Sequence, residues 1–432
     1  MLSIMRVGRS CAVGILALMA LRAPASATTN PPDTLGVVTG PLSLSRALQL
    51  VNRYHPVVRV AGMRAEAIRA RIRDANRLPN PGIAASKENF GGSTGSGRAE
   101  STIGLEQLLE LGGDRKARTG VAEAESRVAS ADAAFIRREI LAATAERFFA
   151  AWTLQSRILR LREGERLTQQ AIEAANARFR AGASPVLERT RAESQALSQA
   201  VERRRTEAEL WIARRELAAQ WGEVQAAFDS LVLPTEEADR SAESRPFQVS
   251  SHPEQLRASA REAEAAARVH LAEAARIPDL TASGGVRRQE GVGGTAFVAA
   301  LHLPLPFWNR GSGALTAARR EREAAALDAR GTERRLQIAM ASALERLGSA
   351  AAVYDTLRLR VRPAQAQLIR ELLQSYRAGR SSYLDLVAEQ RNLLETDRAL
   401  LEAQADLWRA RVGLDLLTGA GVLPPAESEG KR

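Results

Sequence analysis

Few side chains in this sequence have the types and spacing that chemistry at a protein site requires. The nitrogen and thiolate ligands that the 432 residues offer are scattered along the chain, at His55, His252, His270, His302 and Cys11. Zinc and copper sites need such ligands in clusters. The sequence also lacks the glycine-rich phosphate loop and the nucleophile elbow of common enzyme families. It therefore predicts no enzyme activity, no bound cofactor and no metal site.

Two carboxylates occupy equivalent places in two similar stretches. Glu188 lies six residues past Gly182 in FRAGASPVLE, and Asp385 lies six residues past Gly379 in YRAGRSSYLD. Each glycine follows a long helical pattern, at a place where a residue with left-handed backbone commonly ends a helix. From position alone, each carboxylate is an acid in the first turn of the next helix, where the helix dipole favours it.

These stretches belong to an internal repeat with an offset of 197 residues. The match runs without a gap from residues 179 and 376 to residues 222 and 419, and it pairs the rare residues Trp211 and Trp408. His55-Pro56 and His252-Pro253 share the same offset, which favours a structural role for both histidines at the start of a helix. The period far exceeds that of a solenoid unit, so a domain-sized element is duplicated.

The elements that position the two turns are long helices. The pattern predicts helices over 44–77 and 253–276, long helical tracts over about 115–178 and 314–375, and second helices that run to Gly222 and Gly419. A tract of some 60 residues would be roughly 90 Å long, and helices of that length occur as coiled coils. Pro363 should bend or interrupt the second tract.

Short stretches between these helices have the alternation of β-strands. Residues 82–90 and 101–107 flank a glycine-rich loop, and residues 280–287 and 297–303 form a second pair. Their lengths are close to the 9–11 residues of a strand that crosses a bilayer. Four strands cannot close a barrel alone, and open edges are not tolerated in lipid. The chain must therefore associate if these strands lie in a membrane.

The N-terminus has the features of a secretory signal. Arg6 and Arg9 precede the apolar stretch CAVGILALMAL, and Ala25-Ser26-Ala27 follows it. We expect a signal peptide over 1–27, an N-terminal extension over 28–43, a first repeat over 44–222, a linker over 223–251, a second repeat over 252–419 and a polar tail over 420–432.

Four motifs resemble the TolC-like family of outer-membrane efflux channels, and in particular its heavy-metal, CzcC-type branch. LPNPGIAASKENFGG, from Leu78, resembles the entry into the family's first membrane hairpin, and LELGGDRKAR, from Leu109, resembles the exit from it. ALHLPLPFWNRGSG, from Ala300, is the counterpart of that exit in the second half. The FRAG and YRAG turns resemble the two periplasmic helix tips. The resemblance covers residues from about 44 to 419.

This resemblance implies a mainly α fold with a small β part. Three chains would contribute four strands each to a twelve-stranded β-barrel in the outer membrane of a Gram-negative bacterium, and their coiled-coil helices would form an α-barrel in the periplasm. It also implies a homotrimer embedded in outer-membrane lipid, which conducts substrate passively for a periplasmic adaptor protein and an inner-membrane RND-type pump.

The resemblance also implies roles for residues at the tips. An Asp at the place of Asp385 lines the constricted periplasmic end of the family's channels, and Glu188 holds the matching place in the first half. The family often has a second Asp where this chain has Ala388. The adaptor would dock on residues of the two turns: Arg180, Gly182, Ser184, Arg377, Gly379 and Ser381.

Three functions remain open on the sequence alone: an exit duct for heavy-metal cations, a channel of the same family for drugs or organic solutes, and an exported coiled-coil scaffold without a pore. The basic balance, with 61 Lys and Arg against 50 Asp and Glu, could suggest a nucleic-acid partner. The arginines are instead spread along helices among Glu and Gln, which is typical of a solvated helix surface. We therefore expect no nucleic-acid partner.

Overall fold

The computed structural model describes residues 37–89, 99–233, 248–290 and 293–418. The expected signal peptide and C-terminal tail lie outside these ranges, as do most of the expected N-terminal extension and residues 234–247 of the expected linker. Within the described residues helices dominate, and the expectation of a mainly α fold with a small β part is confirmed.

One antiparallel sheet collects the four expected strands in the order β2-β3-β5-β6. The strands are β2 (Gly82–Glu88), β3 (Glu100–Leu109), β5 (Leu280–Gln289) and β6 (Thr295–His302). The two hairpins of the repeat therefore join through β3 and β5, where Gly104 pairs with Gly285. A Cβ added at Gly285 would lie 2.6 Å from the carbonyl oxygen of Ile103, so this close approach of backbones requires glycine.

The register gives the sheet one apolar face and one polar face. Successive rows across the four strands on the apolar face are Ala85–Ile103–Val286–Phe297 and Ile83–Leu105–Gly284–Ala299. The opposite face carries charged and hydroxyl side chains, and there Arg287 donates to Glu100 at 3.0 Å and to Thr102 at 3.1 Å. This alternation is what a strand between lipid and a polar lumen needs.

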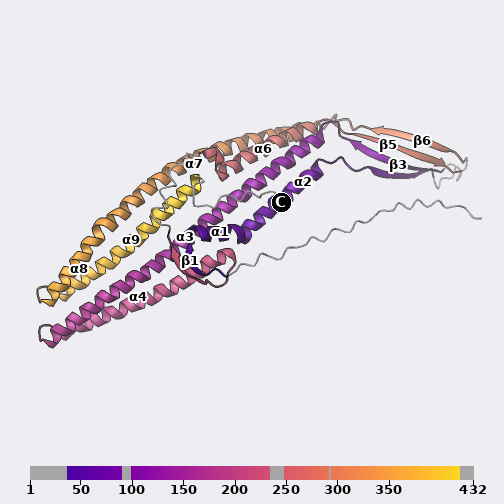
Figure 1. Ribbon diagram of the computed structural model, residues 1–432. Coiled ribbons are helices and arrows are strands. Elements are labelled where there is room, and N and C mark those ends of the chain that lie inside the picture. The colour runs from indigo at the N-terminus through magenta and orange to yellow at the C-terminus, as the bar shows by residue number, and fades with distance from the viewer. Residues whose placement is uncertain (1–36, 90–98, 234–247, 291–292, 419–432) are drawn as a thin grey trace, which may run out of the picture. The chain divides into compact units, whose positions relative to one another are not determined.

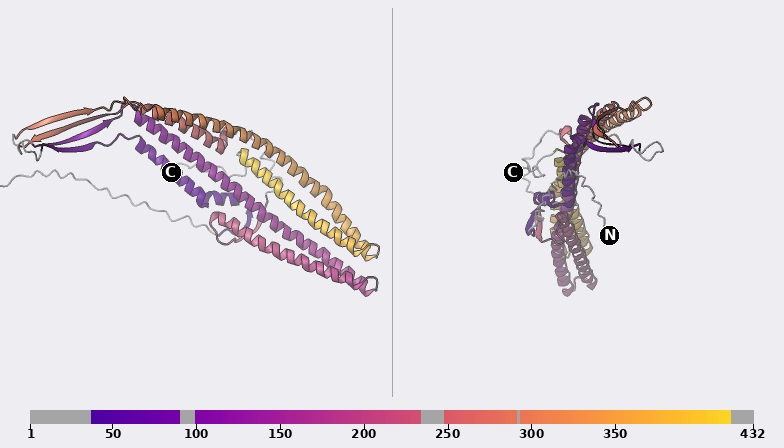
Figure 2. Two further views of the ribbon diagram at one scale, coloured as in Figure 1. Left: turned by 180° about the vertical axis from the view of Figure 1, so that it is seen from behind. Right: turned by 90° about the vertical axis from the view of Figure 1, so that its right-hand side faces the viewer.

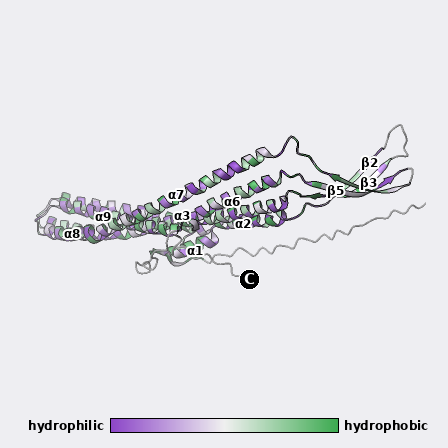
Figure 3. Cartoon of the chain, turned by 90° about the horizontal axis from the view of Figure 1, so that it is seen from above, coloured by the Kyte–Doolittle hydropathy of each residue, from purple (hydrophilic) through white to green (hydrophobic). Residues whose placement is uncertain are grey.

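Two long helical hairpins carry the turns. In the first, α3 (Asp114–Arg180) reverses into α4 (Val186–Ala218). In the second, α7 (Ser312–Thr356) and α8 (Arg362–Arg377) lead to a turn from which α9 (Tyr383–Thr418) returns. The two hairpins lie side by side, α9 packs against α3, and both turns are at the same end (Figure 2). No described helix is long and apolar enough to cross a membrane, and hydrophilic segments recur along α3 and α7 (Figure 3).

A short π-helical stretch, Leu357–Val361, separates α7 from α8. It ends two residues before Pro363, which has no backbone N–H to donate to the preceding turn. The widened π-turn accommodates that missing hydrogen bond, as such bulges do within long helices. The expected interruption of the second tract at Pro363 is confirmed.

The expected single helix over 44–77 is wrong. The chain forms α1 (Leu44–Tyr54) and α2 (Pro56–Ala75), separated by His55 in extended backbone with φ −61° and ψ 123°. A residue before proline is restricted to such conformations. His55 Nδ1 then accepts a hydrogen bond from the Val57 backbone N–H at 3.2 Å and so caps α2.

His252 caps α6 (Pro253–Ala274) in the same way, through a hydrogen bond from the Glu254 backbone N–H to Nδ1 at 3.2 Å. The structural role expected for both histidines is confirmed. The His252 side chain is buried and also contacts Arg138 of α3. Burial and this neighbouring guanidinium lower the pKa of His252 to about 4, so the imidazole is neutral near neutral pH.

A second, parallel pair of strands was not expected. β1 (Gly40–Ser43) falls in the expected N-terminal extension and pairs with β4 (Phe228–Val232), which falls in the expected linker. The side-chain amide of Gln155 on α3 exchanges two hydrogen bonds of 3.0 Å with the backbone of Leu231. Leu42 of β1 and Phe228 of β4 are buried, and the ring centre of Phe228 lies 6.3 Å from that of the buried Trp221.

Candidate functional site

The two turns have the same backbone geometry. Gly182 has φ +69° and Gly379 has φ +77°, both in the left-handed region that side chains resist. After α3, the N–H of Ala183 donates to the carbonyl of Arg178 at 2.8 Å, and after α8 the N–H of Arg380 donates to that of Ser375 at 2.9 Å. These are Schellman motifs, which satisfy the last carbonyls of each helix.

The side chains of the turns differ in their exposure. Arg180 and Arg377 are exposed, whereas Ser381 Oγ donates to the Leu372 carbonyl at 3.3 Å. Ser184 Oγ is buried without a hydrogen-bond partner among the described residues. Between the turns lies an open groove of about 460 Å³, lined by residues of both: Glu173, Ala174, Ala177, Arg178, Ala181, Ala183, Arg377, Ala378 and Gly379. The structure thus brings the expected docking residues together at one end.

The two matched carboxylates have different surroundings. Asp385 is exposed, and its Oδ2 accepts hydrogen bonds from the backbone N–H of Ser382 at 3.2 Å and from Ser382 Oγ at 2.8 Å. Ser382 Oγ in turn accepts from the Asp385 N–H at 3.2 Å. This reciprocal pair is a capping box at the start of α9. Glu188 instead accepts a hydrogen bond from the Tyr376 hydroxyl of the second hairpin, at 2.7 Å.

Tyr376 joins the two hairpins and was not among the residues expected from the sequence. It is fully buried in a cluster with Ala175, Ala192 and Tyr383, and the Arg178 guanidinium lies 4.6 Å from the centre of its ring. Burial and the hydrogen-bonded Glu188 carboxylate raise the pKa of the Tyr376 hydroxyl, so it stays protonated and donates. The repeat contained a signal for Tyr376. The matched residue in the first half is Phe179, so the hydroxyl is present in one half only.

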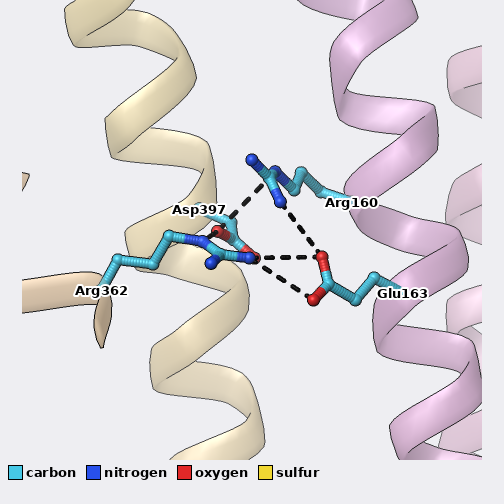
Figure 4. Close-up of polar contacts among 4 residues, drawn as sticks. All are labelled: Arg160, Glu163, Arg362 and Asp397. Atoms are coloured by element: carbon cyan, nitrogen blue, oxygen red, sulfur yellow. Dashed lines mark hydrogen bonds and ion pairs between the residues drawn. The ribbon is translucent and has the colours of Figure 1, made fainter. Parts of the chain in front are cut away.

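A network of four charges joins the hairpins farther from the turns (Figure 4). Arg362 Nε donates to Asp397 Oδ1 at 2.6 Å, and Arg362 Nη2 lies 3.2 Å from Glu163 Oε2. Arg160 Nη1 lies 3.1 Å from the same Glu163 oxygen. Burial alone would lower the pKa of Arg362, but the hydrogen bonds and charges of Asp397 and Glu163 outweigh it and raise that pKa. The network ties α8 and α9 to α3 and was not expected from the sequence.

The arrangement of duplicated hairpins and strands matches a known family. The sequence profile described as "Outer membrane efflux protein" matches residues 47–223 and 249–420. The chain belongs to this family. The alternative of an exported coiled-coil scaffold without a pore is therefore wrong.

Relatives of this outer membrane efflux protein agree in sequence and fold. The cobalt-zinc-cadmium resistance protein CzcC of Cupriavidus metallidurans is 26% identical over 88% of this chain and 90% of its own. Crystal structures of the outer-membrane protein VceC of Vibrio cholerae (TM-score 0.71, 21% identity) and of CusC (TM-score 0.74, 17% identity) each cover 88% of this chain. The matched region makes up 96% of the VceC chain and 92% of the CusC chain. The outer-membrane channel OprN matches with a TM-score of 0.76 and 20% identity, over 88% of this chain and 91% of its own.

This efflux protein is located in the outer membrane and extends into the periplasm, as the resemblance implied. Its family and its structural neighbours are channels rather than enzymes. The described residues contain no cluster of three or more His, Cys, Asp or Glu side chains that could hold a metal ion. The geometry offers an exposed pair of turns at one end and several polar contacts between the hairpins, among them Tyr376–Glu188 and the network around Arg362.

Proposed function

We propose that this protein is the outer-membrane exit duct of a tripartite, RND-type efflux system and that it passively conducts heavy-metal cations. The observation that supports heavy-metal cations as the cargo is the similarity to CzcC, a cobalt-zinc-cadmium resistance protein, over 88% of this chain. Passive conduction fits a chain whose sequence offers scattered ligands rather than a binding cluster, because tight binding in a duct would slow release.

We further propose that the working unit is a homotrimer. In the four-stranded sheet, β2 and β6 are the outer strands and have no partner on their far sides among the described residues. An unpaired strand edge in lipid leaves backbone N–H and C=O groups without hydrogen bonds, at a cost of several kcal/mol for each group. Three copies, edge to edge, would close a twelve-stranded barrel in which every strand is paired.

The turns are proposed as the surface that meets the periplasmic adaptor of an inner-membrane pump. Two exposed arginines, two left-handed glycines and a groove of about 460 Å³ lie together at the end of the molecule opposite the sheet. The surface comprises Arg180, Gly182, Ser184, Arg377, Gly379 and Ser381. Asp385 and Glu188, one helical turn beyond, are proposed to stand at the periplasmic constriction of the pore.

The first prediction concerns the turn at Gly379. Gly379→Val forces a branched side chain into a backbone with φ +77°, which should displace the turn and abolish efflux while the protein stays in the outer membrane. Metal resistance and the amount of protein in the outer-membrane fraction are measured together. Gly348→Val is the matched control, since Gly348 lies inside α7 with open space where a Cβ would be added. Loss of the protein from the membrane would make Gly379 a folding residue and contradict the docking proposal.

The second prediction tests the cargo. A strain without this gene should become more sensitive to at least one of zinc, cobalt, cadmium, copper and silver, because the pump loses its exit. Growth inhibition is measured for each metal, and the wild-type gene should restore resistance whereas the Gly379→Val gene should not. Unchanged resistance to all five metals, together with new sensitivity to dyes or antibiotics, would contradict the metal cargo and favour the drug or organic-solute channel.

A further inference from the structure

The apolar face of the sheet ends in a row of different chemistry. At the ends of the strands remote from the helices, the next row beyond Ala85–Ile103–Val286–Phe297 is Lys87–Ser101–Arg288–Thr295. Because side chains alternate between faces with a period of two, this row shares the face of the apolar rows. Two cations and two hydroxyl groups therefore stand in one line across the sheet.

The apolar rows are exposed to an extent unusual for a water-soluble surface. Phe297 is 92% exposed, and Ile83, Ile103, Leu105 and Leu301 are each more than half exposed. Beyond β6 the apolar character continues towards the helices through Leu303, Leu305, Phe307 and Trp308. For an outer-membrane protein, lipid chains are the solvent that matches this face.

The row lies at the level of the outer leaflet's headgroups. At about 3.3 Å per residue, Ser101 is roughly 26 Å along β3 from Leu109, which a strand tilt of about 40° reduces to roughly 20 Å of height. This is most of the height of the apolar band of outer-membrane barrels, which is about 25 Å. The helices extend into the periplasm from the Leu109 end, so the Ser101 end points away from the cell. Charged side chains that border lipid at this level reach outwards to polar headgroups.

The two cationic side chains of this row, Lys87 and Arg288, differ in whether a neighbouring residue already binds them. The ammonium of Lys87 is half exposed and lies 3.1 Å from Glu290 Oε1, in an exposed ion pair worth little in free energy. The guanidinium of Arg288 is exposed and forms no ion pair or hydrogen bond with any residue that the structure describes. Lys87 and Arg288 are separated by one strand, which sets their backbones about 10 Å apart with Ser101 between them.

We propose that Lys87, Ser101 and Arg288 form a binding site for the phosphorylated headgroup of an anionic lipid in the outer leaflet, whose acyl chains cover the apolar rows below. Arginine binds phosphate through two parallel N–H donors, lysine adds a point charge, and the serine hydroxyl adds a third donor. The site rests on the location of the protein in the outer membrane and is independent of the cargo.

The test uses bisphosphorylated lipid A and the same lipid after removal of its phosphates, which differ only in the proposed ligand group. Native mass spectrometry of the purified protein should show that Arg288→Gln lowers the affinity for the phosphorylated form about tenfold, as expected for one lost charge-assisted contact. Arg288→Lys should retain most of the wild-type affinity for the phosphorylated form. Arg287→Gln is the matched control, because that neighbouring arginine faces the opposite side and bonds Glu100.

Three results would overturn the site. Equal losses in Arg287→Gln and Arg288→Gln would mean that the effect is not specific to the lipid face. Equal binding of the two lipid A forms would exclude the phosphate as the ligand. Displacement of lipid A by an equal concentration of inorganic phosphate would make the row a site for free anions rather than for lipid.

Discussion

Asp397→Asn is expected to loosen the second hairpin from α3. The Asp397 carboxylate is 4% exposed and lies 2.6 Å from Arg362 Nε and 3.9 Å from Arg160 Nε. Its replacement by a neutral amide leaves two guanidinium groups with only Glu163 to balance them. Removing one member of a buried ionic network costs up to 3–5 kcal/mol, and the partial exposure of Arg362 reduces this to about 2 kcal/mol. Hydrogen exchange of α8 and α9 should become faster, by a factor of about 30 for that energy.

The matched control is Glu402→Ala on the same helix. Glu402 pairs with Arg398 at 2.9 Å, but both side chains are more than half exposed, so its loss should change exchange little. A double variant, Arg362→Leu with Asp397→Leu, removes both charges and should recover much of the lost protection, because apolar residues can replace an ionic pair. Slow exchange of α8 and α9 in Asp397→Asn would show that the four-charge network does not hold the hairpins together.

Features that depend on neighbouring residues were predictable from the sequence. The turn at Gly379 was expected because a glycine between two helical patterns marks a left-handed residue. The four strands were expected from their alternation, and a structural role for His55 and His252 from their matched places before proline in the repeat. In each case the constraint acts within a few positions along the chain.

Features that depend on the relative position of distant segments were not predictable. The strand pair of β1 with β4 joins residues about 190 positions apart, and β1 has only four residues, too few to show alternation. The contacts of Tyr376 with Glu188 and of Arg362 with Glu163 require the packing of one hairpin on the other. Many carboxylates and arginines line these helices, and nothing along the chain marks which of them meet.

The two halves of the repeat have diverged at the turns. Glu188 and Asp385 hold matching positions, yet Glu188 accepts a hydrogen bond from Tyr376 of the other hairpin, whereas Asp385 accepts hydrogen bonds from Ser382 at the start of its own helix. A carboxylate engaged by a buried tyrosine connects hairpins, and an exposed one is available to solvent. The proposed pore charge therefore resides more in Asp385 than in Glu188.

Asp385→Asn is expected to reduce the preference of the channel for cations. The asparagine oxygen can still accept from the Ser382 N–H, so the cap of α9 survives while the charge is lost. In water, a unit charge about 6 Å from an ion is worth roughly 0.7 kcal/mol, or a threefold change in the local cation concentration. Three such charges about one axis would add, so planar-bilayer recordings should show a fall in the cation-to-anion permeability ratio of at least about threefold.

Ser382→Ala separates the charge from the cap. It removes the Oγ that donates to Asp385 at 2.8 Å and accepts from the Asp385 N–H at 3.2 Å, which costs about 1 kcal/mol of helix stability but leaves the carboxylate charged. Its ion preference should equal that of the wild type. Equal shifts in both variants would trace the effect to a disordered turn. Unchanged selectivity in Asp385→Asn would place this carboxylate outside the pore, as a capping residue of α9, because a charge that lines a narrow, cation-filled passage cannot be removed without changing the ions that enter it.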